Sequence, residues 1–146
     1  AAMSFLFTLK FLKTAVIAAV VFIALDIIWL SVVAAPWYRK ALGYLASLDA
    51  DGKITFNIPH GLIAQLAITI AISTVVSMAL QLDNRLVTAM LTGGFIGLAF
   101  YTCYDFTNLS FVKGWPLWIS LIDLALGTVQ GVVGGLVVFF FLRTVP

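Results

Sequence analysis

Three aspartates, Asp26, Asp105 and Asp123, lie inside long apolar stretches of the chain. A carboxylate in hydrocarbon costs several kcal/mol, roughly 3 on insertion scales, so one that is kept there usually has a partner or a task. Carboxyl groups in such a setting can take up a proton, bind a hard cation or hold a polar ligand. The helices of the chain must position these three carboxyl groups for any such role.

Other polar side chains share helical faces with the acids. Tyr101, Asp105 and Asn108 recur at four- and three-residue spacing, and Trp29 follows Asp26 by three residues. His60, the single histidine, could complete a cation site or a proton relay, or serve as an axial ligand for a pigment or haem. The candidate ligand- or proton-binding residues are Asp26, Asp105, Asp123, Asn108, His60, Tyr101 and Trp29.

The acids could instead be structural. A carboxyl group that is protonated, or bonded to Trp29, Tyr101 or Asn108, would fix the helices against one another without binding anything else. The sequence requires no cofactor and identifies no metal, and contact with lipid or a pigment stays open. No catalytic residue is predicted, because the chain lacks Gly-x-Ser-x-Gly, a paired cysteine–histidine motif and a histidine-rich box. A lipid-modifying enzyme is the least supported interpretation.

The composition indicates an integral membrane protein. Hydrophobic residues make up 63% and charged residues 10% of the chain, and the mean hydropathy is +1.15. Soluble domains contain about 45–50% apolar and about 25% charged residues. The net charge of +2 is too small and too dispersed to indicate nucleic-acid binding. We expect a bacterial inner membrane or an organellar membrane.

Four apolar runs are long enough to cross a hydrocarbon core, which takes about 20 residues. They cover about residues 11–35, 59–82, 86–109 and 116–142. Pro36 should end the first helix, whereas Pro59 and Pro116 suit first helical turns. We predict an all-α fold with a single domain over residues 1–146, in which four transmembrane helices form an up-down bundle because two connections are short.

The longest connection, after Pro36, is predicted to be only partly irregular. Trp37, Ala41 and Tyr44 recur at helical spacing with Arg39 and Lys40 on the other side, which favours a short helix in the membrane interface. The alternative is an ordinary loop anchored by aromatic side chains. The predicted interfacial residues are Lys113, Trp115, Arg39 and Trp37.

The depth of the acids follows from the helix ends. The first and third helices end, and the second and fourth begin, at one face of the membrane. At 1.5 Å per residue, Asp26 lies about 15 Å, Asp105 about 6 Å and Asp123 about 10 Å from that face. We therefore expect them in one leaflet, on inward faces. Basic residues are equal in number at the two faces, so the side of the N-terminus stays undecided.

Several motifs resemble a small bacterial and algal membrane-protein family, the "domain of unknown function 2177" family. These are Asp26-x-x-Trp29-Leu30, Tyr104-Asp105-x-Thr107-Asn108-Leu109, Lys113-Gly114-Trp115-Pro116 and Asp123-x-x-x-Gly127-Thr128. The resemblance covers most of the chain. It implies four helices and no established activity.

The leading hypothesis is a small polytopic protein whose acidic cluster near one face binds a proton, a cation or a polar ligand. Transport would require an oligomer, because four helices enclose little space. The alternative is a non-catalytic accessory subunit of a larger photosynthetic or respiratory complex, and the start Ala1-Ala2-Met3 indicates a processed N-terminus. The expected partners are membrane lipids and a homo-oligomer or larger membrane complex, without nucleic acid.

Overall fold

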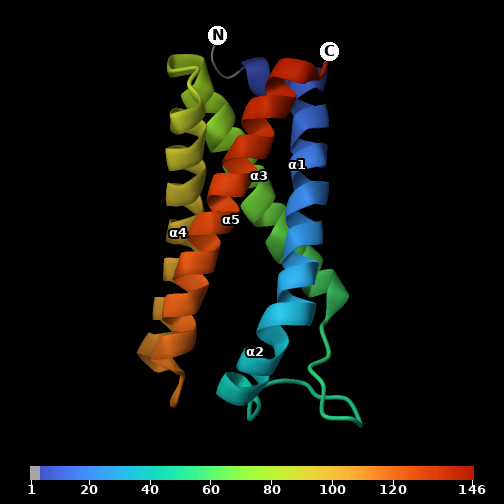
Figure 1. Ribbon diagram of the computed structural model, residues 1–146, viewed down its shortest axis with the longest axis vertical. Coiled ribbons are helices and arrows are strands. Elements are labelled where there is room, and N and C mark those ends of the chain that lie inside the picture. Colours follow the sequence, from blue (N-terminus) through green and yellow to red (C-terminus); the bar gives the residue numbers. More distant parts are fainter. Residues whose placement is uncertain (1–3) are drawn as a thin grey trace.

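The computed structural model describes residues 4–146, which form a bundle of apolar helices (Figure 1). Within these residues, four helical segments are long and apolar enough to cross a membrane: Leu9–Leu42, Ile58–Leu82, Leu86–Phe111 and Leu117–Thr144. This confirms the predicted all-α membrane bundle. The first three residues, on which the expectation of a processed start rests, lie outside the described part of the chain.

The first segment does not end at Pro36, so that prediction was wrong. After a 3-10 turn, η1 (Ser4–Phe7), helix α1 spans Leu9–Ile28, and a π-helical stretch, η2 (Trp29–Ala34), leads into α2 (Ala35–Leu42). Pro36 lies in the first turn of α2, where its missing N–H is tolerated. The wider π-helical turns immediately before it change the hydrogen-bond register, so the chain stays helical across the proline.

The short helix expected after Pro36 is present, but it continues the first span. It is amphipathic and carries Arg39 and Lys40 in its last turn. Residues 43–57 form turns with one isolated antiparallel bridge between Leu48 and Ile54. Asp49 organises these turns, because its side chain accepts hydrogen bonds from the backbone N–H groups of residue 51 at 3.0 Å and residue 53 at 2.7 Å.

Helix α3 (Ile58–Leu82) and helix α4 (Leu86–Phe111) are antiparallel neighbours joined by residues 83–85. In this connection the carboxylate of Asp83 accepts two hydrogen bonds from Arg85 Nε, at 2.8 and 2.9 Å, and one from Thr88. These hydrogen bonds, that from Arg85 foremost, hold the pKa of Asp83 below its usual value. The short connection explains the up-down order of the two helices.

Helix α5 (Leu117–Thr144) packs most extensively against α4. The contact is made by glycines: a Cβ atom on Gly97 would meet the carbonyl oxygen of Gly127, and one on Gly93 would meet that of Gly131. The backbones of α4 and α5 therefore approach closely at these glycines. Backbones this close gain van der Waals contact, which drives helix association where lipid supplies no hydrophobic force.

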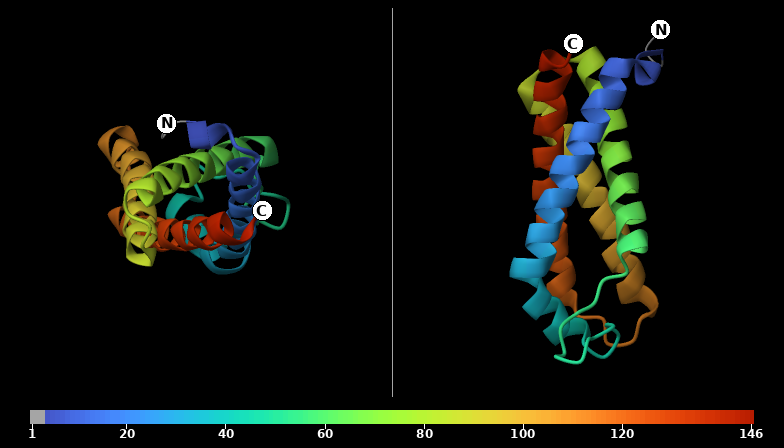
Figure 2. Two further views of the ribbon diagram at one scale, coloured as in Figure 1. Left: turned by 90° about the horizontal axis from the view of Figure 1, so that it is seen from above. Right: turned by 90° about the vertical axis from the view of Figure 1, so that its right-hand side faces the viewer.

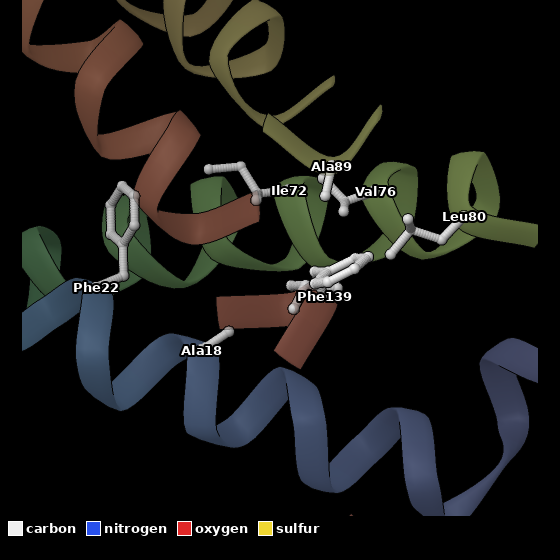
Figure 3. Close-up of a cluster of buried hydrophobic side chains, with 8 residues drawn as sticks. Ala18, Phe22, Ile72, Val76, Leu80, Ala89 and Phe139 are labelled. Carbon is white, nitrogen blue, oxygen red and sulfur yellow. The ribbon is translucent and has the colours of Figure 1, made fainter. Parts of the chain in front are cut away.

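Apolar packing is concentrated in the half of the bundle that contains both chain ends. Phe22, Ile72, Val76 and Phe139 form the centre of a buried cluster contributed by α1, α3 and α5, with Ala89 from α4 (Figure 3). Towards the other end α1 and α2 diverge from the α4–α5 pair, and the 43–57 connection crosses that end (Figure 1, Figure 2).

Candidate functional site

A cavity of about 710 Å³, partly open to the surroundings, lies between the helices at the end where they diverge. All the long helices and the 43–57 connection contribute to its wall. Most lining side chains are apolar or aromatic, and the main polar ones are Asp26, Tyr38, Gln65, Tyr101 and Asp123. Among the described residues that line it, none is lysine, arginine or histidine. The cavity thus combines apolar walls with two acids.

Asp26 is held by amide groups from two other helices. The residue is 4% exposed, and its Oδ1 accepts a hydrogen bond from Gln130 Nε2 at 2.9 Å. Its Oδ2 accepts from Gln65 Nε2. Gln130 Oε1 in turn accepts from the Tyr101 hydroxyl at 2.8 Å. This chain of hydrogen bonds joins α4, α5, α1 and α3, so it both ties the bundle and orients one carboxyl group.

The chemistry of this network follows from its donors. With each oxygen accepting from an amide N–H, Asp26 is bonded as an ionised carboxylate is. Amides are neutral, so they stabilise the charge without cancelling it. Uptake of a proton would require one glutamine amide to turn and offer its oxygen; Gln65 Oε1 is buried and has no hydrogen-bond partner among the described residues. Asp26 therefore has two neutral donors, and no described cationic side chain is hydrogen-bonded to it.

Asp123 is bound by a tyrosine that the sequence interpretation did not include. It is 1% exposed, and its Oδ1 accepts a hydrogen bond from the Tyr38 hydroxyl. Tyr38 lies on α2, so this contact depends on the helix continuing beyond Pro36. Asp26 and Asp105 both lie within electrostatic range of Asp123. Two of the three acids therefore line one cavity.

Asp105 lies outside the cavity wall, buried in the α4–α5 contact. Its side chain is fully buried, beside Ser120 and Trp115. The Trp115 indole N–H donates to Ser120 Oγ at 3.0 Å, and neither carboxyl oxygen of Asp105 meets hydrogen-bond geometry with a described residue. A buried acceptor without a partner lowers stability. The desolvation cost of burying Asp105 is therefore poorly compensated, and the residue does not line the cavity.

Asp105→Asn should leave the bundle as stable as the wild type or stabilise it by about 1–3 kcal/mol, because it removes the desolvation cost of an unpartnered buried acid. Unfolding in detergent by heat or by titration with sodium dodecyl sulfate measures the difference. Asp51→Asn, in the exposed connection, is the matched control and should have no effect. A destabilisation above about 1 kcal/mol would show that Asp105 is bonded in the folded protein.

His60 and Asn108 are not brought to the cavity. His60 is exposed at the start of α3, and its Nδ1 lies 2.5 Å from the side-chain oxygen of Asn57, which caps that helix. Asn108 is half-buried and donates to the carbonyl of Tyr104 on its own helix at 3.0 Å. Within residues 4–146, no group of three or more His, Cys, Asp or Glu side chains is arranged to hold a metal ion.

The aromatic and basic residues predicted for the interface gather at the same end. Trp29 packs edge to face against Trp37 with ring centroids 5.9 Å apart, and its buried indole N–H has no partner among the described residues. Trp115 lines the cavity. Arg39 lies against the turn at Gly52, and Tyr44 donates to the Lys113 carbonyl at 3.3 Å. Trp115 therefore belongs to the cavity wall as well as to the predicted interfacial set.

Gln130, Tyr38 and Gln65 were not predicted from the sequence as hydrogen-bond partners of the acids. A signal for Gln130 existed, because it follows Asp123 by seven residues and so shares its face of an otherwise apolar helix. Tyr38 had no such signal. Its role depends on the helix that continues through Pro36.

Comparison with known proteins gives one family. The family described as "Predicted membrane protein (DUF2177)" matches residues 11–140, a range that contains both acids of the cavity and their glutamine and tyrosine partners. No curated protein and no solved structure matches the chain. The description of the family names a location and no activity.

Proposed function

The chain belongs to the DUF2177 family of predicted membrane proteins, and from the cavity we propose that it binds a small lipophilic cation between its helices. One observation carries the proposal: a cavity of about 710 Å³ with apolar and aromatic walls is also lined by the buried acids Asp26 and Asp123. The walls suit an apolar body, and the acids suit a positive charge.

The balance of charge supports a cation over a neutral or anionic ligand. A carboxylate removed from water is costly unless it is paired. The described partners of Asp26 and Asp123 are the neutral side chains of Gln65, Gln130 and Tyr38. A ligand cation would supply the missing countercharge. Aromatic side chains in the wall, Tyr104 and Trp115 among them, can add cation–π attraction.

The volume supports an organic ligand over a bare ion. Sites for small organic molecules have volumes of about 300–1,000 Å³ and are mainly apolar with a few placed polar groups. The cavity falls in this range. A proton competes for the same carboxylates, because protonation removes the charge that the cation needs. Binding should therefore weaken as the pH falls through the range in which the two acids titrate.

Two probes of matched size and opposite charge test this proposal. Tetraphenylphosphonium should bind the purified protein in detergent at least tenfold more tightly than tetraphenylborate, measured by equilibrium dialysis. Leaving a buried charge without its partner costs about 3–5 kcal/mol, which corresponds to a factor of more than ten. Asp123→Asn should remove most of this preference, and lowering the pH of the wild type should do the same.

Asp83→Asn is the matched control, since Asp83 lies at the opposite end of the bundle and outside the cavity. It should bind tetraphenylphosphonium as the wild type does. Equal binding of the two probes, or the same loss in both aspartate variants, would contradict the proposal.

The second candidate, an accessory subunit with structural acids, is favoured by the continuous chain of hydrogen bonds from Tyr101 through Gln130 and Asp26 to Gln65. Such a chain of hydrogen bonds can hold the helices together without binding a ligand. Native gels of gently solubilised membranes distinguish the two candidates. A heavy complex containing other proteins supports the accessory role, and migration as a free monomer or homodimer counts against it.

A further inference from the structure

A second, smaller cavity of about 190 Å³ lies at the opposite end of the bundle, close to both chain ends. Lys10 at the start of α1 and Arg143 at the end of α5 both line it. Its other walls mix amide side chains, including Asn84, with apolar ones, including Leu80 and Phe139. The cavity is therefore basic and amphipathic, whereas the larger one is acidic.

The guanidinium of Arg143 is held in place on two sides. Its Nη2 donates to the backbone carbonyl and to Oδ1 of Asn84, at 3.0 and 2.9 Å. Its Cζ lies 3.7 Å from the centroid of the Phe139 ring. Nε and Nη1 make no further hydrogen bond to the described residues. A fixed guanidinium with free donors is the group that recognises phosphate most specifically.

No described carboxylate forms an ion pair with Lys10 or Arg143. Among residues 4–146 the one ion pair joins Arg85 to Asp83, and neither Lys10 nor Arg143 takes part in it. Two cations at the same end of transmembrane helices attract an anion from the headgroup layer. The apolar side chains beside them can contact the first carbons of a lipid.

We propose that this cavity binds the phosphodiester group of an anionic phospholipid. Arg143 donates to the phosphate oxygens, Lys10 adds a second charge, and Leu80 and Phe139 contact the glycerol and upper acyl carbons. A free phosphate ion shares the recognised group, but the apolar walls and the position at the end of the spanning helices favour the lipid. The site does not depend on the cation proposed for the acidic cavity.

Native mass spectrometry of the delipidated protein with added lipid tests the proposal. Phosphatidylglycerol should be retained at least tenfold better than phosphatidylcholine. Lys10→Gln and Arg143→Gln should each lower phosphatidylglycerol retention about fivefold, the effect of one basic residue near an anionic headgroup. Lys10→Gln is the cleaner variant, because Arg143→Gln also removes the contacts to Asn84.

Lys53→Gln and Lys113→Gln remove the same charge at the other end of the bundle and should change retention less than twofold. Equal retention of the two lipids would overturn the proposal. An equal loss in the control variants would also overturn it, by showing an unspecific charge effect. Displacement of phosphatidylglycerol by millimolar inorganic phosphate would assign the cavity to a soluble anion and overturn the lipid proposal.

Discussion

Gly97→Ala is expected to destabilise the bundle by about 3 kcal/mol or to prevent its folding. The added Cβ would meet the carbonyl oxygen of Gly127 and lie close to the Cα of Gly131. Both are backbone atoms of α5, so no side chain can rotate away. Overpacking of an interior typically costs about 1–3 kcal/mol, and a contact between two backbones belongs at the upper end. Unfolding by sodium dodecyl sulfate in detergent micelles measures the loss.

Gly61→Ala is the matched control for this substitution. Gly61 lies in the first turns of α3, and a Cβ there would meet nothing within 4 Å. Alanine favours helix over glycine by up to about 1 kcal/mol, so this variant should be neutral or slightly more stable. If Gly97→Ala were as stable as Gly61→Ala, the α4–α5 contact would be looser than the structure has it.

Asp26→Leu and Asp26→Asn should separate the two roles of the buried network. Leucine leaves the amide groups of Gln65 and Gln130 without their acceptor, and each unpaired buried donor costs about 1–3 kcal/mol. We expect this variant to lose about 3 kcal/mol of stability. Asparagine keeps the shape and can still bond both glutamines after one amide turns, so its stability should stay within about 1 kcal/mol of the wild type.

Asparagine removes the negative charge of the Asp26 carboxylate, and ligand binding measures the effect of that loss. Asp26→Asn should bind tetraphenylphosphonium at least tenfold more weakly than the wild type, because the buried countercharge is lost, while it unfolds at nearly the same denaturant concentration. Dialysis and unfolding on the same preparation give both values. If Asp26→Asn unfolded as readily as Asp26→Leu and still bound the cation normally, the binding proposal would be contradicted. The acids would then have a structural role alone.

The membrane bundle itself could be predicted because its causes are local. The length of an apolar run determines whether a helix can cross the bilayer, and short connections make consecutive helices antiparallel. The same reasoning placed Asp26 and Asp123 at one end of the bundle. The glycine pairs of α4 and α5 have the same kind of local cause, since residues four apart in the sequence share a face in any α-helix.

Tertiary structure alone decided the partners of each acid. Whether Asp26 meets Gln130, or Asp105 is left without a partner, depends on how each helix is rotated and tilted against the others, and residue spacing within one helix does not contain that information. The continuation of the first helix past Pro36 is a further case, because π-helical turns before the proline carry Tyr38 to Asp123.

The three aspartates of the sequence thus divide into two that line a cavity and one that does not. The sequence by itself predicted that these acids would lie within apolar helices and towards one end of the bundle, since hydropathy and helix rise depend only on the order of residues. Only the packed bundle shows which of the three aspartates line the cavity, because the distance between two side chains on different helices depends on how those helices cross.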